Sequence, residues 1–166
     1  VLTYTEQALQ QLPLVSQLIR ARLLALQGWA YDRKGDRSKA VQSYAQAMEK
    51  DPSVFRRVGL SIPTQFPVAS GVSGEVVDAL RRSPRFTEAN SGFSIQIEEG
   101  SSCLLGPSGE MFSCADWPDR ETDQSKEDYI VSITEAFHIE AFGLTTGLTG
   151  AQWNSLDGTT TSSKKA

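Results

Sequence analysis

The spacing of hydrophobic and polar residues in this 166-residue chain changes near residue 60. Before that point, apolar residues recur every three or four positions. This predicts helices over 3–12, from Pro13 to about 34, and over 37–50, with one or two further turns at 53–60. Later, Phe93 to Glu98 alternates apolar and polar residues as a half-buried strand does. The chain is therefore expected to join a helical part to a part that contains strands.

The second part has the pattern of a small α+β domain. Gly106 to Glu110 is a turn sequence between two short apolar runs and predicts a β-hairpin. Ser125 followed by Asp128 is a capping-box pattern, which opens a helix with one apolar stripe. We therefore expect an α+β fold in which a helical hairpin precedes a three-stranded antiparallel sheet with a covering helix.

A stretch that contains Pro63, Pro67 and several small residues separates the two parts. The expected organisation is a helical region at 1–60, a linker at 61–72, a small α+β domain at 73–157 and a flexible tail at 158–166. Because residue 1 is Val rather than Met, we also expect that a segment has been removed before it.

Composition and charge narrow the function classes. The apolar and charged fractions, 39% and 22%, are those of an ordinary folded protein. Residues 1–60 carry nine Lys and Arg against five Asp and Glu, whereas residues 61–166 carry seven against fifteen. These opposite signs either hold the halves together, steer separate partners or are ordinary solvated surface charge. Neither half has the dense basic patch of a nucleic-acid binder, and no apolar run is long enough for a transmembrane segment.

Residues 21–54 alternate small and large side chains at helical spacing. Gly28 and Ala40 fall where two antiparallel helices would cross closely, and large side chains fall beside that crossing. The segment resembles a tetratricopeptide repeat, a helix-turn-helix unit of about 34 residues. The positions that agree in register are Gly28, Tyr31, Gly35, Ala40, Tyr44, Ala47 and Pro52, whereas Gln27 stands where the family usually has Leu.

The resemblance implies a protein-binding surface on the first helix of the repeat. Carried over by register, its positions are Arg22, Ala25, Trp29, Asp32 and Arg33. A tryptophan beside arginines is the kind of cluster that dominates binding energy, although Trp29 packing within the chain is the competing interpretation. A single repeat cannot bury both faces, so the rest of the chain, a second copy or another protein should cover the open one.

The two cysteines are predicted to face each other. Cys103 and Cys114 lie symmetrically about Ser108 and Gly109, so a hairpin centred there places them directly opposite, within reach of a disulfide. A disulfide would indicate an oxidising compartment. The alternative is a pair of reduced, buried cysteines.

The remaining candidate chemistry is weak. His138 is the only histidine and adjoins the apolar stripe of its helix, so we expect a packing role rather than catalysis. Asp119 to Ser125 places oxygen ligands at alternate positions, but lacks the glycine and the closing acid of a calcium loop. We expect no catalytic residues, no metal and no cofactor.

These observations lead to a functional hypothesis. The chain is expected to be a non-enzymatic scaffold or accessory subunit that binds partner proteins or a second copy of itself, without a small-molecule ligand. Its expected location is periplasmic or extracellular, as part of the cell envelope, rather than cytoplasmic. The alternative is a small enzyme or ligand-binding α+β domain localised by the repeat, with a deep pocket holding His138 and carboxylates.

Overall fold

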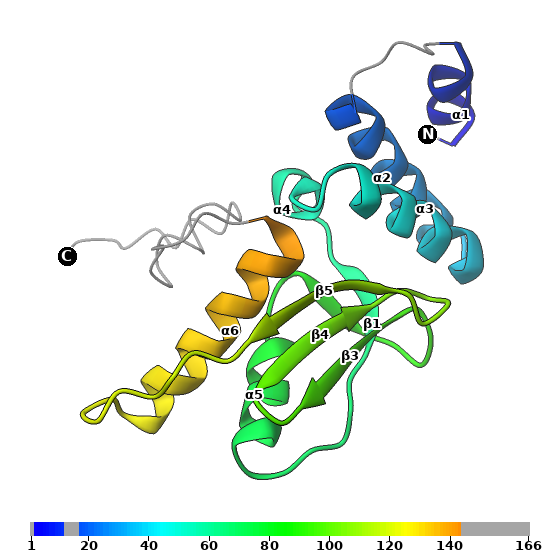
Figure 1. The fold of residues 1–166 in the computed structure, drawn as a ribbon. Helices are drawn as coiled ribbons and strands as arrows, with labels where there is room; N and C mark the ends of the chain where they lie inside the picture. Colours follow the sequence, from blue (N-terminus) through cyan, green and yellow to red (C-terminus); the bar gives the residue numbers. More distant parts are fainter. Residues whose placement is uncertain (1, 12–16, 144–166) are drawn as a thin grey trace, which may run out of the picture.

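The computed structural model describes residues 2–11 and 17–143. The expected tail at 158–166, the end of the α+β domain at 157 and the helix start at Pro13 lie outside these residues. The described elements, shown in Figure 1, are α1 (Leu2–Gln11), α2 (Gln17–Arg33), α3 (Arg37–Lys50), α4 (Val54–Val58), β1 (Ile62–Gln65), α5 (Gly71–Arg81), β2 (Phe86–Glu88), β3 (Phe93–Glu98), β4 (Ser101–Leu105), β5 (Met111–Asp116) and α6 (Lys126–Phe142).

Helices α2 and α3 form a hairpin with a close crossing. A Cβ atom placed on Gly28 would lie 2.6 Å from Cδ1 of Tyr44 and 3.0 Å from the carbonyl oxygen of Ala40. The Tyr44 ring is fully buried and packs edge-on against Phe55 of α4, with the ring centroids 5.4 Å apart. Asp36 caps α3 by accepting a hydrogen bond from the backbone of Lys39. Because Gly28 has no side chain, the two helices can approach closely at this crossing.

The expected three-stranded antiparallel sheet is wrong. The sheet has five strands in the order β2-β1-β3-β4-β5, and β1 is parallel to both of its neighbours. Sequence reading missed β1 because Pro63 in its interior argues against a strand, and missed β2 because three residues are too few to show a period. The segment expected as a linker therefore contains a central strand.

The pairing of β1 shows why Pro63 is tolerated there. Ile62 donates its N–H to the carbonyl oxygen of Arg85, and the Thr64 carbonyl oxygen accepts from Ala89, both at 2.9 Å. These bonds join β1 to the β2 side. On the other side, β3 begins to pair only at Thr64. Pro63 itself is paired with Thr87 of β2, and the N–H that it lacks would face the β3 side, before the pairing of β1 with β3 begins.

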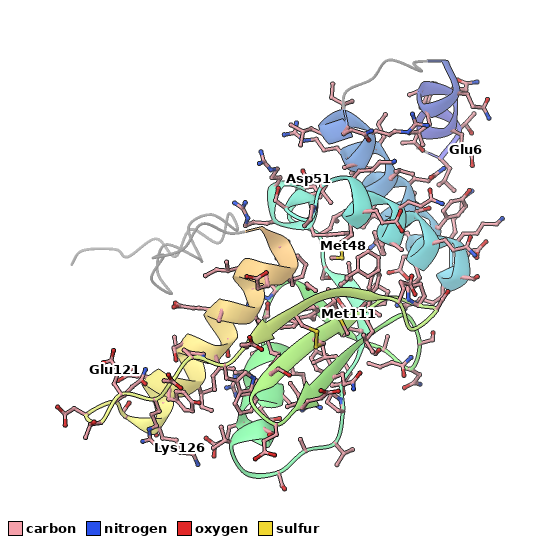
Figure 2. The ribbon with its side chains drawn as sticks, in the orientation of Figure 1. Glu6, Met48, Asp51, Met111, Glu121 and Lys126 are labelled. Carbon is pink, nitrogen blue, oxygen red and sulfur yellow. A yellow bond between two sulfur atoms is a disulfide. The ribbon has the colours of Figure 1, made fainter. Side chains whose placement is uncertain are left out.

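The predicted hairpin and disulfide are confirmed. Cys103 pairs with Cys114 across β4 and β5, and their sulfur atoms are bonded. The loop consists of Pro107 to Gly109, closed by a hydrogen bond from the Gly106 N–H to the Glu110 carbonyl oxygen, and Gly109 has a φ of +81°. A bulge between Leu104 and Leu105 restores the register before the cysteines. Figure 2 shows the disulfide beside Met111, whose sulfur lies 3.3 Å from that of Cys114.

Helices α5 and α6 cover the sheet. Helix α6 begins as predicted, with Ser125 accepting a hydrogen bond from the backbone of Asp128. It packs against β4 and β5, while α5 packs beside it and against β2 (Figure 1). Apolar side chains from α2, α3, α4, the sheet, α5 and α6 form one continuous core cluster. The helical hairpin and the sheet are thus joined through shared buried surface.

The helix crossing gives a stability prediction. We expect Gly28→Ala to destabilise the protein by about 1–3 kcal/mol, because the new methyl group overlaps the immobile Tyr44 ring. This sign is opposite to the gain of about 1 kcal/mol that alanine gives over glycine in an open helix. Urea denaturation measures the change. In a Tyr44→Ala background the same substitution should cost less, and an equal cost in both backgrounds would exclude this contact as the cause.

The disulfide gives a second prediction. Replacing both cysteines, as Cys103→Ser with Cys114→Ser, should lower the free energy of unfolding by about 3 kcal/mol. The two cysteines are separated by 11 residues in sequence, and a disulfide that closes a loop of this length lowers the entropy of the unfolded chain by about that amount. Urea denaturation of the variant and of the oxidised parent measures the loss. Adding a reductant should destabilise the parent alone, because the variant has no bridge to lose.

Candidate protein-binding surface

The five positions predicted to bind a partner all lie on α2, but they do not share one face. Arg22, Trp29 and Arg33 are exposed, with 40% of Trp29 accessible to solvent. Ala25 is fully buried. Asp32 is partly buried and pairs with Arg37 of α3 at 3.2 Å. The structure therefore brings three of the five together on the surface and places the other two in the helical packing.

Two leucines that the sequence reading did not select complete the exposed face. Leu18 and Leu26 are 48% and 39% accessible, and with Trp29 they place three exposed apolar side chains along one helix. They share the helical spacing of the exposed predicted residues, and this spacing is the signal that could have found them. We call this surface the α2 stripe; its residues are Leu18, Arg22, Leu26, Trp29 and Arg33.

The contacts of α2 explain why this stripe is exposed. The other sides of the helix pack against α1, α3 and α4 (Figure 1). Tyr31 donates its hydroxyl hydrogen to Glu6 of α1 at 2.8 Å, which fastens α1 beside α2 and raises the pKa of Tyr31. Three neighbouring helices thus leave one side of α2 free.

The α2 stripe is both apolar and cationic. The guanidinium group of Arg33 lies 5.7 Å from the centre of the Trp29 ring, in a cation–π arrangement. Among the described residues, no acidic group pairs with Arg22 or Arg33. A rigid aromatic ring between two forked cations is suited to a partner that presents apolar and acidic groups.

His138 occupies a different kind of environment. It is 2% accessible and lies among the rings of Phe86, Phe137 and Phe142, at centroid distances of 5.9 to 6.0 Å. Its Nδ1 is 2.7 Å from the carbonyl oxygen of Thr134, and its Nε2 is 2.7 Å from the hydroxyl of Ser83. Burial lowers the pKa of His138 to about 4, with a smaller opposing effect from the Thr134 hydrogen bond. The histidine is therefore a neutral core residue, held by hydrogen bonds.

Two neighbouring surface hollows are lined by other residues than this histidine. One hollow, of about 750 Å³, lies where β1 and β2 end beside α3; it is lined by Arg37, Gln65, Phe66, Glu88, Ala89, Asn90 and Ser91. An adjoining hollow of about 450 Å³ shares Arg37 and Ser91 with it. Both are open to solvent; the first is lined mainly by polar surface, whereas apolar surface predominates in the second.

The structure also bears on metal sites and on membrane-spanning helices. In 2–11 and 17–143, no three His, Cys, Asp or Glu side chains converge as ligands for a metal ion. In the segment from Asp119 to Ser125, Arg120 and Glu121 make hydrogen bonds to Gln124, and Ser125 caps α6. Within the same ranges, each helix is too short or too polar to cross a bilayer.

Comparison with protein-family models, curated proteins and solved structures finds no significant match to this chain.

The environment of His138 predicts how stability depends on pH. In the folded protein the imidazole of His138 takes up a proton with a pKa of about 4, whereas in the unfolded chain its pKa is near 6.5. Because the unfolded chain binds the proton more readily, the free energy of unfolding should fall by about 3 kcal/mol as the pH drops from 6.5 to 4. Urea denaturation at several pH values measures the fall. His138→Gln should remove the part of the pH dependence that comes from the histidine and keep the part that comes from the carboxylates. If the pH dependence of the free energy of unfolding is the same in this variant, the assignment to His138 is wrong.

Proposed function

We propose that the chain is a non-enzymatic scaffold or accessory subunit of a larger assembly, and that it binds partner proteins through α2. The observation that carries the proposal is the α2 stripe, on which Leu18, Leu26 and Trp29 remain exposed, whereas Leu24 and the small residues of α2 are buried. Exposed apolar surface framed by charged groups is characteristic of interaction sites. The resemblance of 21–54 to a tetratricopeptide repeat supports the same function.

The state of His138 supports a role without catalysis. A nucleophilic mechanism needs an accessible base beside an activated nucleophile. His138 instead has both ring nitrogens in hydrogen bonds and almost no contact with solvent. We also propose that the protein works in the periplasm, the cell envelope or the exterior, because disulfides such as Cys103–Cys114 persist in oxidising surroundings.

Ligand binding by the α+β part is the second candidate function. The hollow at the ends of β1 and β2 favours it, because its side-chain amides and Arg37 offer several hydrogen-bonding groups around Phe66. This hollow does not contain the expected His138 with several carboxylates, because the one acidic residue in its lining is Glu88. We therefore rank ligand binding below protein binding.

Partner recovery tests the proposed function. Trp29→Ala should reduce recovery of crosslinked partners by about thirtyfold, the effect of losing a hot-spot residue worth about 2 kcal/mol, and Arg33→Ala should act in the same direction. The measurement is in-cell crosslinking of the tagged chain, followed by quantitative mass spectrometry. Val68→Ala, which also truncates an exposed apolar residue, is the control. Equal recovery with all variants would reject α2 as the binding surface.

A further inference from the structure

Helix α6 carries an exposed surface of opposite charge to the α2 stripe. Glu127, Val131 and Glu135 follow one another at four-residue spacing, so they lie along one side of the helix. Val131 is 50% accessible, Glu127 is exposed and Glu135 is partly buried. We call these three residues the α6 stripe.

The α6 stripe borders a hollow between α5 and α6 that could receive an apolar side chain. This hollow measures about 310 Å³. Ala79, Ile130 and Val131 supply its apolar lining, and its charged lining is Glu75, Asp78, Arg82 and Glu127. Charges on its α5 side are partly balanced within the chain, since Asp78 pairs with Arg81 and Glu75 with Lys126.

Two carboxylates of the α6 stripe make no ion pair within the described part of the chain. Among the described residues, no basic group pairs with Glu127 or Glu135. Partial burial without a cation raises the pKa of Glu135. An arginine brought to this surface would therefore meet acids that the chain itself leaves unbalanced.

The two stripes are similar in pattern and opposite in charge, although the arginines stand about 16.5 Å apart along α2 and the glutamates about 12 Å apart along α6. On α2, Arg22 precedes Leu26 by four residues and Arg33 follows Trp29 by four. On α6, Glu127 and Glu135 stand four residues on either side of Val131. Each stripe is thus an apolar centre flanked by two charges, basic on one helix and acidic on the other.

We propose that the α2 stripe of one copy docks on the α6 stripe of a second copy, so that the chain associates head-to-tail with itself. This inference rests on the proposed function, because it names the partner of the same α2 surface. The two helices lie at opposite ends of the molecule (Figure 1), which excludes the contact within a single copy. Docking of two α2 stripes on each other would gather four arginines without an acid, at a cost in electrostatic energy.

Head-to-tail contact has a consequence for assembly. The interface joins two different surfaces, so every added copy presents a fresh α2 stripe at one end and a fresh α6 stripe at the other. Association therefore continues into chains, or closes when the last α2 stripe meets the first α6 stripe, in a ring of two or more copies.

Sedimentation velocity of the whole chain, with its disulfide intact, tests the proposal. We expect the mean mass to rise above that of the monomer as the concentration approaches about 1 mM at low salt, and to fall again as added salt screens the charges. A monomer throughout this range would overturn self-association. If Trp29→Ala nevertheless abolished the crosslinking of a partner of different mass, the proposed function would hold while the self-association would be rejected.

Charge reversal identifies the surfaces. One variant carries Arg22→Glu with Arg33→Glu, and the other carries Glu127→Lys with Glu135→Lys. Each alone should associate at least about tenfold more weakly than the parent, because like charges then face each other. An equimolar mixture should recover the association, since the reversed stripes of the two variants again complement one another.

A matched control separates this effect from net charge. Glu98→Lys with Glu99→Lys makes the same change in charge at exposed positions away from α6, and it should keep the association of the parent. If the α6 reversal leaves association unchanged, or if the mixture fails to recover it, the head-to-tail contact is wrong. Circular dichroism confirms that each variant is folded.

Discussion

The guanidinium group of Arg85 is the connection on which the arrangement of the two parts depends. It is almost fully buried and donates hydrogen bonds to the carbonyl oxygens of Phe55 and Leu60, at the end of α4. An arginine stays charged in proteins, so its burial requires such acceptors. The backbone of the same residue accepts a hydrogen bond from Ile62 of β1. Arg85 thereby ties the helical part to the sheet from both its side chain and its main chain.

This connection also decides which surfaces remain free. With its end fixed to the sheet, α4 lies against α2 and α3 and buries Val54 and Phe55. Helix α4 takes one side of α2, while α1 and α3 take two others, so the α2 stripe is what remains. At the other end, α6 uses its apolar side to cover the sheet and presents Val131 between two glutamates.

Charge separation between the halves is maintained in the folded chain. The ion pairs described above stay within one half or the other: Asp32 pairs with Arg37 and Glu75 with Lys126, for example. The two halves are joined instead by apolar packing and by hydrogen bonds from Arg85. Their opposite charges are therefore available to act between molecules, which is the physical basis of the proposed head-to-tail contact.

The sequence alone determined the features that depend on local spacing. Residues 37–50 and 93–98 form the predicted helix and strand, and hairpin symmetry placed Cys103 opposite Cys114. Only the tertiary structure decided the parallel strands β1 and β2. Their pairing joins segments that are distant in sequence, and strands of four and three residues are too short to show an alternation of apolar and polar residues. It also decided burial along α2: Ala25 and Trp29 share a helix, but only the neighbouring helices determine which of them is covered.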